Sequence, residues 1–111
     1  MQKNWLLNCK ESGLEIWSIH LPFIRKWDLS NDDAKEALAD DRKLIEAAEK
    51  AGIRVAVIHP SFEPIPEADR AKRIENAKKN LKLLNQTAKE HGIVLALENL
   101  PRTCLAIILR R

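Results

Sequence analysis

Two histidines and one glutamate stand at matching places behind short apolar runs, and these side chains could bind a metal ion. His20 and His59 each lie seven residues after a glycine, and Glu98 lies six residues after a third glycine. Imidazole nitrogens and carboxylate oxygens are suitable ligands for zinc, manganese or cobalt, and a metal so held can polarise a carbonyl or acidify bound water. The alternative is that the histidines hydrogen-bond loop backbone and that Glu98 is solvated.

Three similar segments carry these residues. They read "GLEIWSIHLPF" from Gly13, "GIRVAVIHPSF" from Gly52 and "GIVLALENLPR" from Gly92. Each has a glycine, an apolar run, and a polar residue with proline close behind. The run 55–58 is β-branched and apolar on both sides, which is typical of a strand in a parallel sheet. The polar residues then stand at the carboxyl ends of strands, the edge where ligands bind in α/β sheets.

Two helical patterns separate the three segments. Residues 31–50 show apolar positions at helical spacing, with Ser30 or Asn31 as the expected cap. A second helix is expected to begin near Pro66, a favourable first-turn residue, and to end at Gly92. A further short amphipathic helix with Trp5, Leu6 and Cys9 is expected before Gly13.

The order of these elements predicts an α/β fold. Strands joined by helices are parallel and connected by right-handed crossovers. The repeat of about 40 residues is close to one unit of a (β/α)8 barrel. We therefore expect a partial TIM barrel of about three βα units with two open strand edges, formed by a single domain over residues 1–111 with an atypical tail at 105–111.

The equal offsets also predict how the three side chains are aligned. We expect His20 and His59 at equivalent positions of neighbouring strands, about 4.8 Å apart. Glu98 is one residue out of step. Because side chains alternate between faces, it would point the wrong way unless a bulge or a different helix end absorbs the mismatch.

Three motifs carry a resemblance to a known family. "IHLPF", "VIHPS" and "LALENLP", in this order and spacing, resemble strands three to five of the xylose isomerase-like TIM barrels, which include sugar phosphate isomerases and epimerases and apurinic-site endonucleases. The resemblance covers the chain to about Cys104. It implies a divalent metal (Zn, Mn, Mg or Co) at the mouth of the barrel and a small sugar or sugar phosphate as substrate.

The resemblance also implies roles for the three residues. Glu98 matches a metal ligand close to the proton-transfer chemistry, His59 a residue that binds substrate or metal, and His20 a pocket residue or zinc ligand. The family's further ligands come from strands six to eight, which this sequence does not contain. The chain ends in "LAIILRR" instead, so we expect a truncated relative of the sugar isomerases and epimerases that is inactive by itself and lacks a full metal shell.

Other residues permit two interpretations. Trp27 and Phe62 lie in loops at the expected mouth, where an aromatic ring could stack on a sugar or pack as a lid. Arg102 could hold a phosphate, although an arginine after proline is more often plain surface. Trp17 is expected to pack within its strand. His91, in the last turn before Gly92, is expected to play a structural role at the helix end.

Composition limits the other functional classes. The net charge of +3, with both signs mixed, gives little support to nucleic-acid or membrane binding. The two cysteines have no C-x-x-C spacing, and no signal peptide or membrane span is evident, which favours a cytoplasmic protein. The alternatives are an apurinic-site endonuclease with a zinc cluster, and a non-enzymatic remnant that forms a homodimer through its open strand edges.

Overall fold

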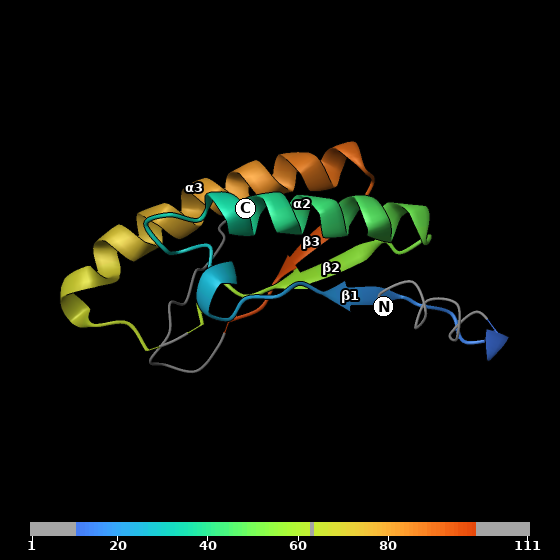
Figure 1. The fold of residues 1–111 in the computed structure, drawn as a ribbon, viewed down its shortest axis with the longest axis horizontal. Coiled ribbons are helices and arrows are strands. Elements are labelled where there is room, and N and C mark those ends of the chain that lie inside the picture. The colour runs from blue at the N-terminus through green and yellow to red at the C-terminus, as the bar shows by residue number, and fades with distance from the viewer. Residues whose placement is uncertain (1–10, 63, 100–111) are drawn as a thin grey trace.

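Three parallel strands form the sheet of this protein. The computed structural model describes residues 11–62 and 64–99. Its strands are β1 (Ser18–His20), β2 (Val55–Ile58) and β3 (Val94–Leu97), hydrogen-bonded in the order β1-β2-β3. Both neighbouring pairs run parallel (Figure 1). The expected α/β arrangement of a partial TIM barrel is confirmed, and the sheet is not closed.

Helices connect the strands and cover one face of the sheet. Helix α2 (Lys35–Lys50) lies between β1 and β2, and α3 (Arg70–Glu90) lies between β2 and β3. Single 3₁₀ turns, η1 (Arg25–Trp27) and η2 (Glu67–Asp69), precede them. Figure 1 shows both long helices on the same side of the sheet. The short helix expected around Trp5 lies outside the described residues.

The start of α2 differs from the prediction. Ala34 is the N-cap residue and makes no side-chain capping bond, and the carboxylate of Asp33 accepts the Lys35 N–H at 3.3 Å. The expected cap at Ser30 or Asn31 is therefore wrong. The hydroxyl of Ser30 instead donates to the carboxylate of Asp28. A side chain that could have capped the helix is used within the loop before it.

The two glycines that end the helices behave as expected. Gly52 and Gly92 have φ of 77° and 67°, a region that favours glycine. The N–H of Ile53 donates to the carbonyl of Ala48 at 2.9 Å, and Ile93 makes the equivalent bond after α3. Each helix thus turns directly into the following strand.

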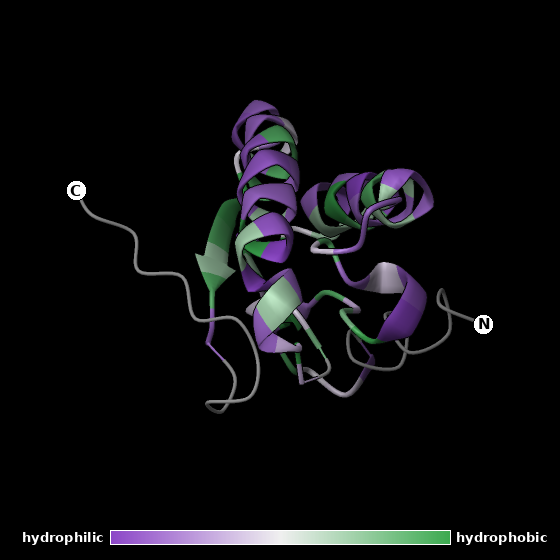
Figure 2. Cartoon of the chain, turned by 90° about the vertical axis from the view of Figure 1, so that its left-hand side faces the viewer, coloured by the Kyte–Doolittle hydropathy of each residue, from purple (hydrophilic) through white to green (hydrophobic). Residues whose placement is uncertain are grey.

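The core lies between the helices and one face of the sheet. Ala56 and Ile58 of β2 are fully buried there, together with Ile45 of α2 and Leu84 of α3. Both helices are mainly hydrophilic on their outer sides (Figure 2). This one-sided apolar packing fixes which residues of each strand point toward the helices and which point away.

The other face of the sheet carries no helix among residues 11–62 and 64–99. Val55 and Val57 alternate with the buried residues of β2 and point to this face. The register pairs Val57 with His20 on one side and with Ala96 on the other, so these residues share the face. In a closed barrel this would be the interior.

Several expectations about the surface have different outcomes. Trp17 is 72% exposed, so its predicted packing role is wrong for the described part of the chain. Self-association through the edges of β1 and β3 stays a prediction, as does the single domain over residues 1–111; the tail 105–111 lies outside the described residues. None of the described helices combines the length and the apolar character needed to cross a bilayer.

Candidate metal centre

His20, His59 and Glu98 lie together at the carboxyl ends of the three strands. The Nε2 atoms of His20 and His59 are 3.0 Å apart. The Oε1 atom of Glu98 is 3.2 Å from His59 Nε2 and 3.9 Å from His20 Nε2. One ligand atom from each residue thus lies within 4.8 Å of the others. The fold brings together the three residues that the spacing singled out.

The alignment differs from the prediction. The register pairs His20 with Val57, two positions before His59. The pairing of Ile58 with Leu97 continues to place His59 beside Glu98, and the N–H of Glu98 donates to the carbonyl of Ile58 at 2.9 Å. His59 and Glu98 are therefore level, and His20 is staggered by an even number of residues. An even stagger keeps a side chain on the same face.

The physical reason for this difference is the varying length of the helix-to-strand turns. Ser18 lies five residues after Gly13, whereas its partner Val55 lies three after Gly52. Val94, the partner of Val55 in β3, lies only two residues after Gly92. Counting from the glycines therefore predicts that His20 and His59 are level, whereas the register offsets them by two residues. It also predicts that Glu98 is out of register with His59, whereas these two residues are level.

Backbone contacts define which nitrogen of each imidazole carries its proton. His59 Nδ1 lies 2.7 Å from the carbonyl oxygen of Glu98, and His20 Nδ1 lies 2.9 Å from that of Leu21. A carbonyl oxygen only accepts, so each Nδ1 must donate its hydrogen. The neutral form of each ring then presents a bare Nε2 lone pair to the centre of the cluster. This is the arrangement in which metal-binding histidines are commonly held.

Three acceptor atoms therefore face one another. Two Nε2 lone pairs at 3.0 Å repel unless a proton or a cation lies between them, and the carboxylate of Glu98 adds a negative charge at 3.2 Å. Ligands at the 2.0 to 2.1 Å typical of zinc are about 3.3 Å apart around a tetrahedron. The observed separations of 3.0, 3.2 and 3.9 Å bracket that value. The donor set and its spacing fit a divalent cation.

Aromatic rings cover the cluster from the side of the loops. The ring of Phe23 lies 4.2 Å from that of His59 and 5.4 Å from that of His20, between centroids. His59 is only 4% exposed, while the side chain of Glu98 is 63% exposed. The site therefore has one buried imidazole and one carboxylate that reaches solvent, which leaves it accessible to a small polar ligand.

The remaining predicted site residues are placed differently. Trp27 lies in η1 and donates its Nε1–H to Asp40 at 3.1 Å. It lines a pocket of about 520 Å³ whose described lining includes His20 but neither His59 nor Glu98. Phe62 packs on Phe23 at 5.7 Å, so its ring belongs to the cover of the site. Arg102 lies outside the described residues, and its role as a substrate ligand stays a prediction, as does that of Trp27.

His91 has the structural environment expected for it. It is the residue that ends α3, and its Nδ1 forms an ion pair with Glu49 near the end of α2. Both residues lie before the strands begin, whereas His20 and His59 lie where strands end. His91 therefore takes no part in the candidate metal centre.

Sequence reasoning missed two buried carboxylates. Asp28 is 3% exposed and forms a network with Ser30, Phe62 and Arg73. Asp41 is fully buried in α2, and neither of its carboxylate oxygens has a hydrogen-bond partner among residues 11–62 and 64–99. Burial, reinforced by the charge of Asp40, raises the pKa of Asp41 to about 7. The sequence does contain a signal for the burial of Asp41. It lies four residues before Ile45, and this spacing places both residues on the same buried side of the helix.

Comparison with known proteins identifies the fold. Residues 3–108 match the family model described as xylose isomerase-like TIM barrel. A D-tagatose 3-epimerase-like protein superposes with a TM-score of 0.73 at 25% identity, covering 90% of this chain and 38% of that one. No match was found among curated proteins.

Two further solved structures show the same fold. D-psicose 3-epimerase from Clostridium cellulolyticum H10, solved with D-tagatose, has a TM-score of 0.72 at 20% identity over 91% of this chain and 37% of its own. A xylose isomerase-like TIM barrel protein from Mycobacterium smegmatis, solved with magnesium, has a TM-score of 0.63 at 19% identity over 86% and 35%. This chain therefore spans less than two fifths of the length of these structures.

Proposed function

Because the chain belongs to the xylose isomerase-like TIM barrel family, we propose that it carries the metal-binding part of a sugar isomerase or epimerase site, with His20, His59 and Glu98 as ligands. The observation that supports this most is the meeting of three hydrogen-bond acceptors, 3.0 to 3.9 Å apart, at the carboxyl edge of the sheet. Such a cluster is favourable only with a cation or a proton at its centre.

The backbone contacts of the two imidazoles support the same proposal. With both Nδ1–H groups donating to carbonyls, each ring is held in one orientation with Nε2 directed inward. Fixing the rings in advance lowers the entropy that binding must overcome. These three ligands leave coordination positions for water, substrate or further protein groups.

A bound divalent cation would polarise the carbonyl and the neighbouring hydroxyl of a sugar. Glu98 can take up a proton near such a group, because its carboxylate is largely exposed whereas His59 is buried. We propose a small sugar or sugar phosphate as the substrate class, since the similar structures include epimerases of such compounds. Turnover requires a second acid or base, so we expect this chain alone to bind without reacting.

The proposal predicts that sugar binding depends on both the metal and the carbonyl. Zinc-loaded protein titrated with D-tagatose should show shifts in the backbone amide NMR signals of His20, Phe23 and His59. Galactitol, which has the same chain length but a hydroxyl in place of the carbonyl, should produce much smaller shifts. Equal shifts for both compounds, or shifts that persist without metal, would argue against a sugar isomerase or epimerase site.

A further inference from the structure

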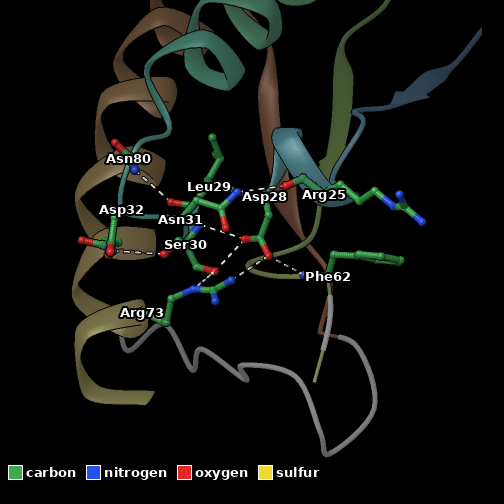
Figure 3. A network of polar contacts seen from close by, with 10 residues as sticks. Arg25, Asp28, Leu29, Ser30, Asn31, Asp32, Phe62, Arg73 and Asn80 are labelled. Carbon is green, nitrogen blue, oxygen red and sulfur yellow. Dashed lines mark hydrogen bonds and ion pairs between the residues drawn. The ribbon is translucent and has the colours of Figure 1, made fainter. Parts of the chain in front are cut away.

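A buried carboxylate joins the two loops that carry the cover of the site. Asp28 Oδ1 accepts hydrogen bonds from the N–H and the hydroxyl of Ser30, at 2.8 and 2.6 Å. Its Oδ2 accepts from the N–H of Phe62 and from Arg73 Nη2, each at 3.0 Å (Figure 3). Four donors therefore fill the acceptor capacity of one carboxylate, and the guanidinium compensates its charge.

The donors come from three parts of the chain. Ser30 lies in the loop after β1, Phe62 in the loop after β2, and Arg73 in the first turn of α3. Arg73 also donates from Nε to the hydroxyl of Ser30 at 2.9 Å. Its guanidinium therefore binds both Asp28 and Ser30. Asn80 further along α3 fixes the same loop separately, donating to the carbonyl of Leu29 at 2.8 Å.

This network is connected to the candidate metal centre through Phe62 and Phe23. Phe62 follows His59 by three residues. Its N–H donates to Asp28, and this bond joins the loop after β2 to the loop after β1. Phe23 belongs to the other tied loop and packs on the rings of Phe62, His59 and His20. A shift between the two loops would therefore displace the ring that packs on both imidazoles.

We propose that Asp28 is a positioning residue for the metal centre, acting with Arg73. By fixing the loop after β2 against the loop after β1, it keeps Phe23 packed on His59 and His20 and holds their Nε2 atoms close together. The inference rests on the proposed function for its effect on metal binding. Its structural part, the link from Asp28 to the packing of Phe23 on His59, stands independently.

The test substitutes Asp28→Asn. The amide is isosteric, but one of the two oxygens becomes an NH₂ group that faces donors, so the four bonds of the carboxylate cannot all be kept. The negative charge that Arg73 compensates is lost as well. We expect zinc affinity to fall by about 10-fold, as for residues that orient metal ligands. We also expect the nuclear Overhauser contact between the rings of Phe23 and His59 to weaken in the metal-free protein.

Asn80→Ala is the matched control, because it removes one bond between α3 and the same loop without touching Asp28. It should lower stability while keeping both the ring contact and the zinc affinity. If Asp28→Asn does not fold, Arg73→Lys serves instead, since it keeps the charge but not the paired donors, and the same two losses are expected in milder form.

The outcomes separate the two proposals. Asp28→Asn or Arg73→Lys that folds with an unchanged ring contact overturns the inference, as does an equal loss of that contact in Asn80→Ala. A wild-type protein that does not bind zinc would contradict the proposed function, while the ring contact in metal-free protein would still decide the role of Asp28.

Discussion

Asp41→Asn is expected to make the protein more stable at pH 8, by up to about 4 kcal/mol, and to change its stability little at pH 4. Asp41 is fully buried, and neither carboxylate oxygen has a hydrogen-bond partner in the described part of the chain. Burial is the main cause that raises its pKa from 3.8 to about 7, and the charge of Asp40 adds to it. Ionising this group in the folded protein therefore costs free energy that the unfolded chain does not incur.

The sign of the pH dependence follows from the proton count. Between about pH 4 and pH 7 the folded state holds more protons at Asp41 than the unfolded state, so stability falls as pH rises. The contribution is fully present below the unfolded pKa and is lost as pH rises through about 7. Asp32, whose pKa is lowered by hydrogen bonds from Lys72 and Asn76, contributes in the opposite sense and only at lower pH.

Urea unfolding of wild type and Asp41→Asn between pH 4.5 and 8 measures this difference. The two free energies of unfolding should diverge with increasing pH. Asp40→Asn is the matched control, because it removes the charge beside Asp41 but keeps the buried carboxyl group of Asp41. It should only slightly reduce the slope of the free energy of unfolding against pH. Parallel curves for wild type and Asp41→Asn would show that Asp41 has no raised pKa in the folded protein.

Removing a ligand should weaken zinc binding on the order of 100-fold or more, a larger effect than the loss of an orienting group. His59→Ala deletes the buried imidazole, and Glu98→Gln replaces one carboxylate oxygen with an NH₂ group that cannot coordinate. Glu98 is 63% exposed, so its substitution should leave the fold intact. Affinity should also decrease as pH falls, because protons compete for the ligand atoms.

Calorimetric titration with zinc and with manganese gives the affinities directly. His91→Ala and Glu67→Gln are suitable controls, because His91 pairs with Glu49 at the other end of the strands and Glu67 is 95% exposed on η2. Both controls should bind like wild type. Similar weak heats in wild type, His59→Ala and Glu98→Gln would mean that the three residues do not form a metal site.

The order of elements was predictable because its determinants are local. Apolar periodicity predicted α2 and α3, and glycines with positive φ ended both helices as expected. The partners within the site were predictable for the same reason, since strand ends share one edge. Their alignment was not, because turns of different length precede the strands, and the register depends on packing between segments about 40 residues apart.

The network around Asp28 could be predicted from the sequence only in part. The D-x-S pattern of Asp28 and Ser30 is a local turn signal, and Arg73 and Asn80 share one side of α3 by helical spacing. The bond from Asp28 to Phe62, however, joins residues 34 positions apart. Nothing local indicates that Phe23 covers His59, because the contacts of Phe23 with His59 and Phe62 join the segment after β1 to the segment after β2.

The most direct test of the metal centre is the NMR signal of each imidazole nitrogen with and without one equivalent of zinc. The structure predicts that zinc shifts the Nε2 signals of His20 and His59 together, while their Nδ1 atoms stay protonated and bonded to carbonyls. His91 should not respond. Unchanged Nε2 signals for His20 and His59, or a response confined to His91, would contradict a metal centre formed by these strand ends.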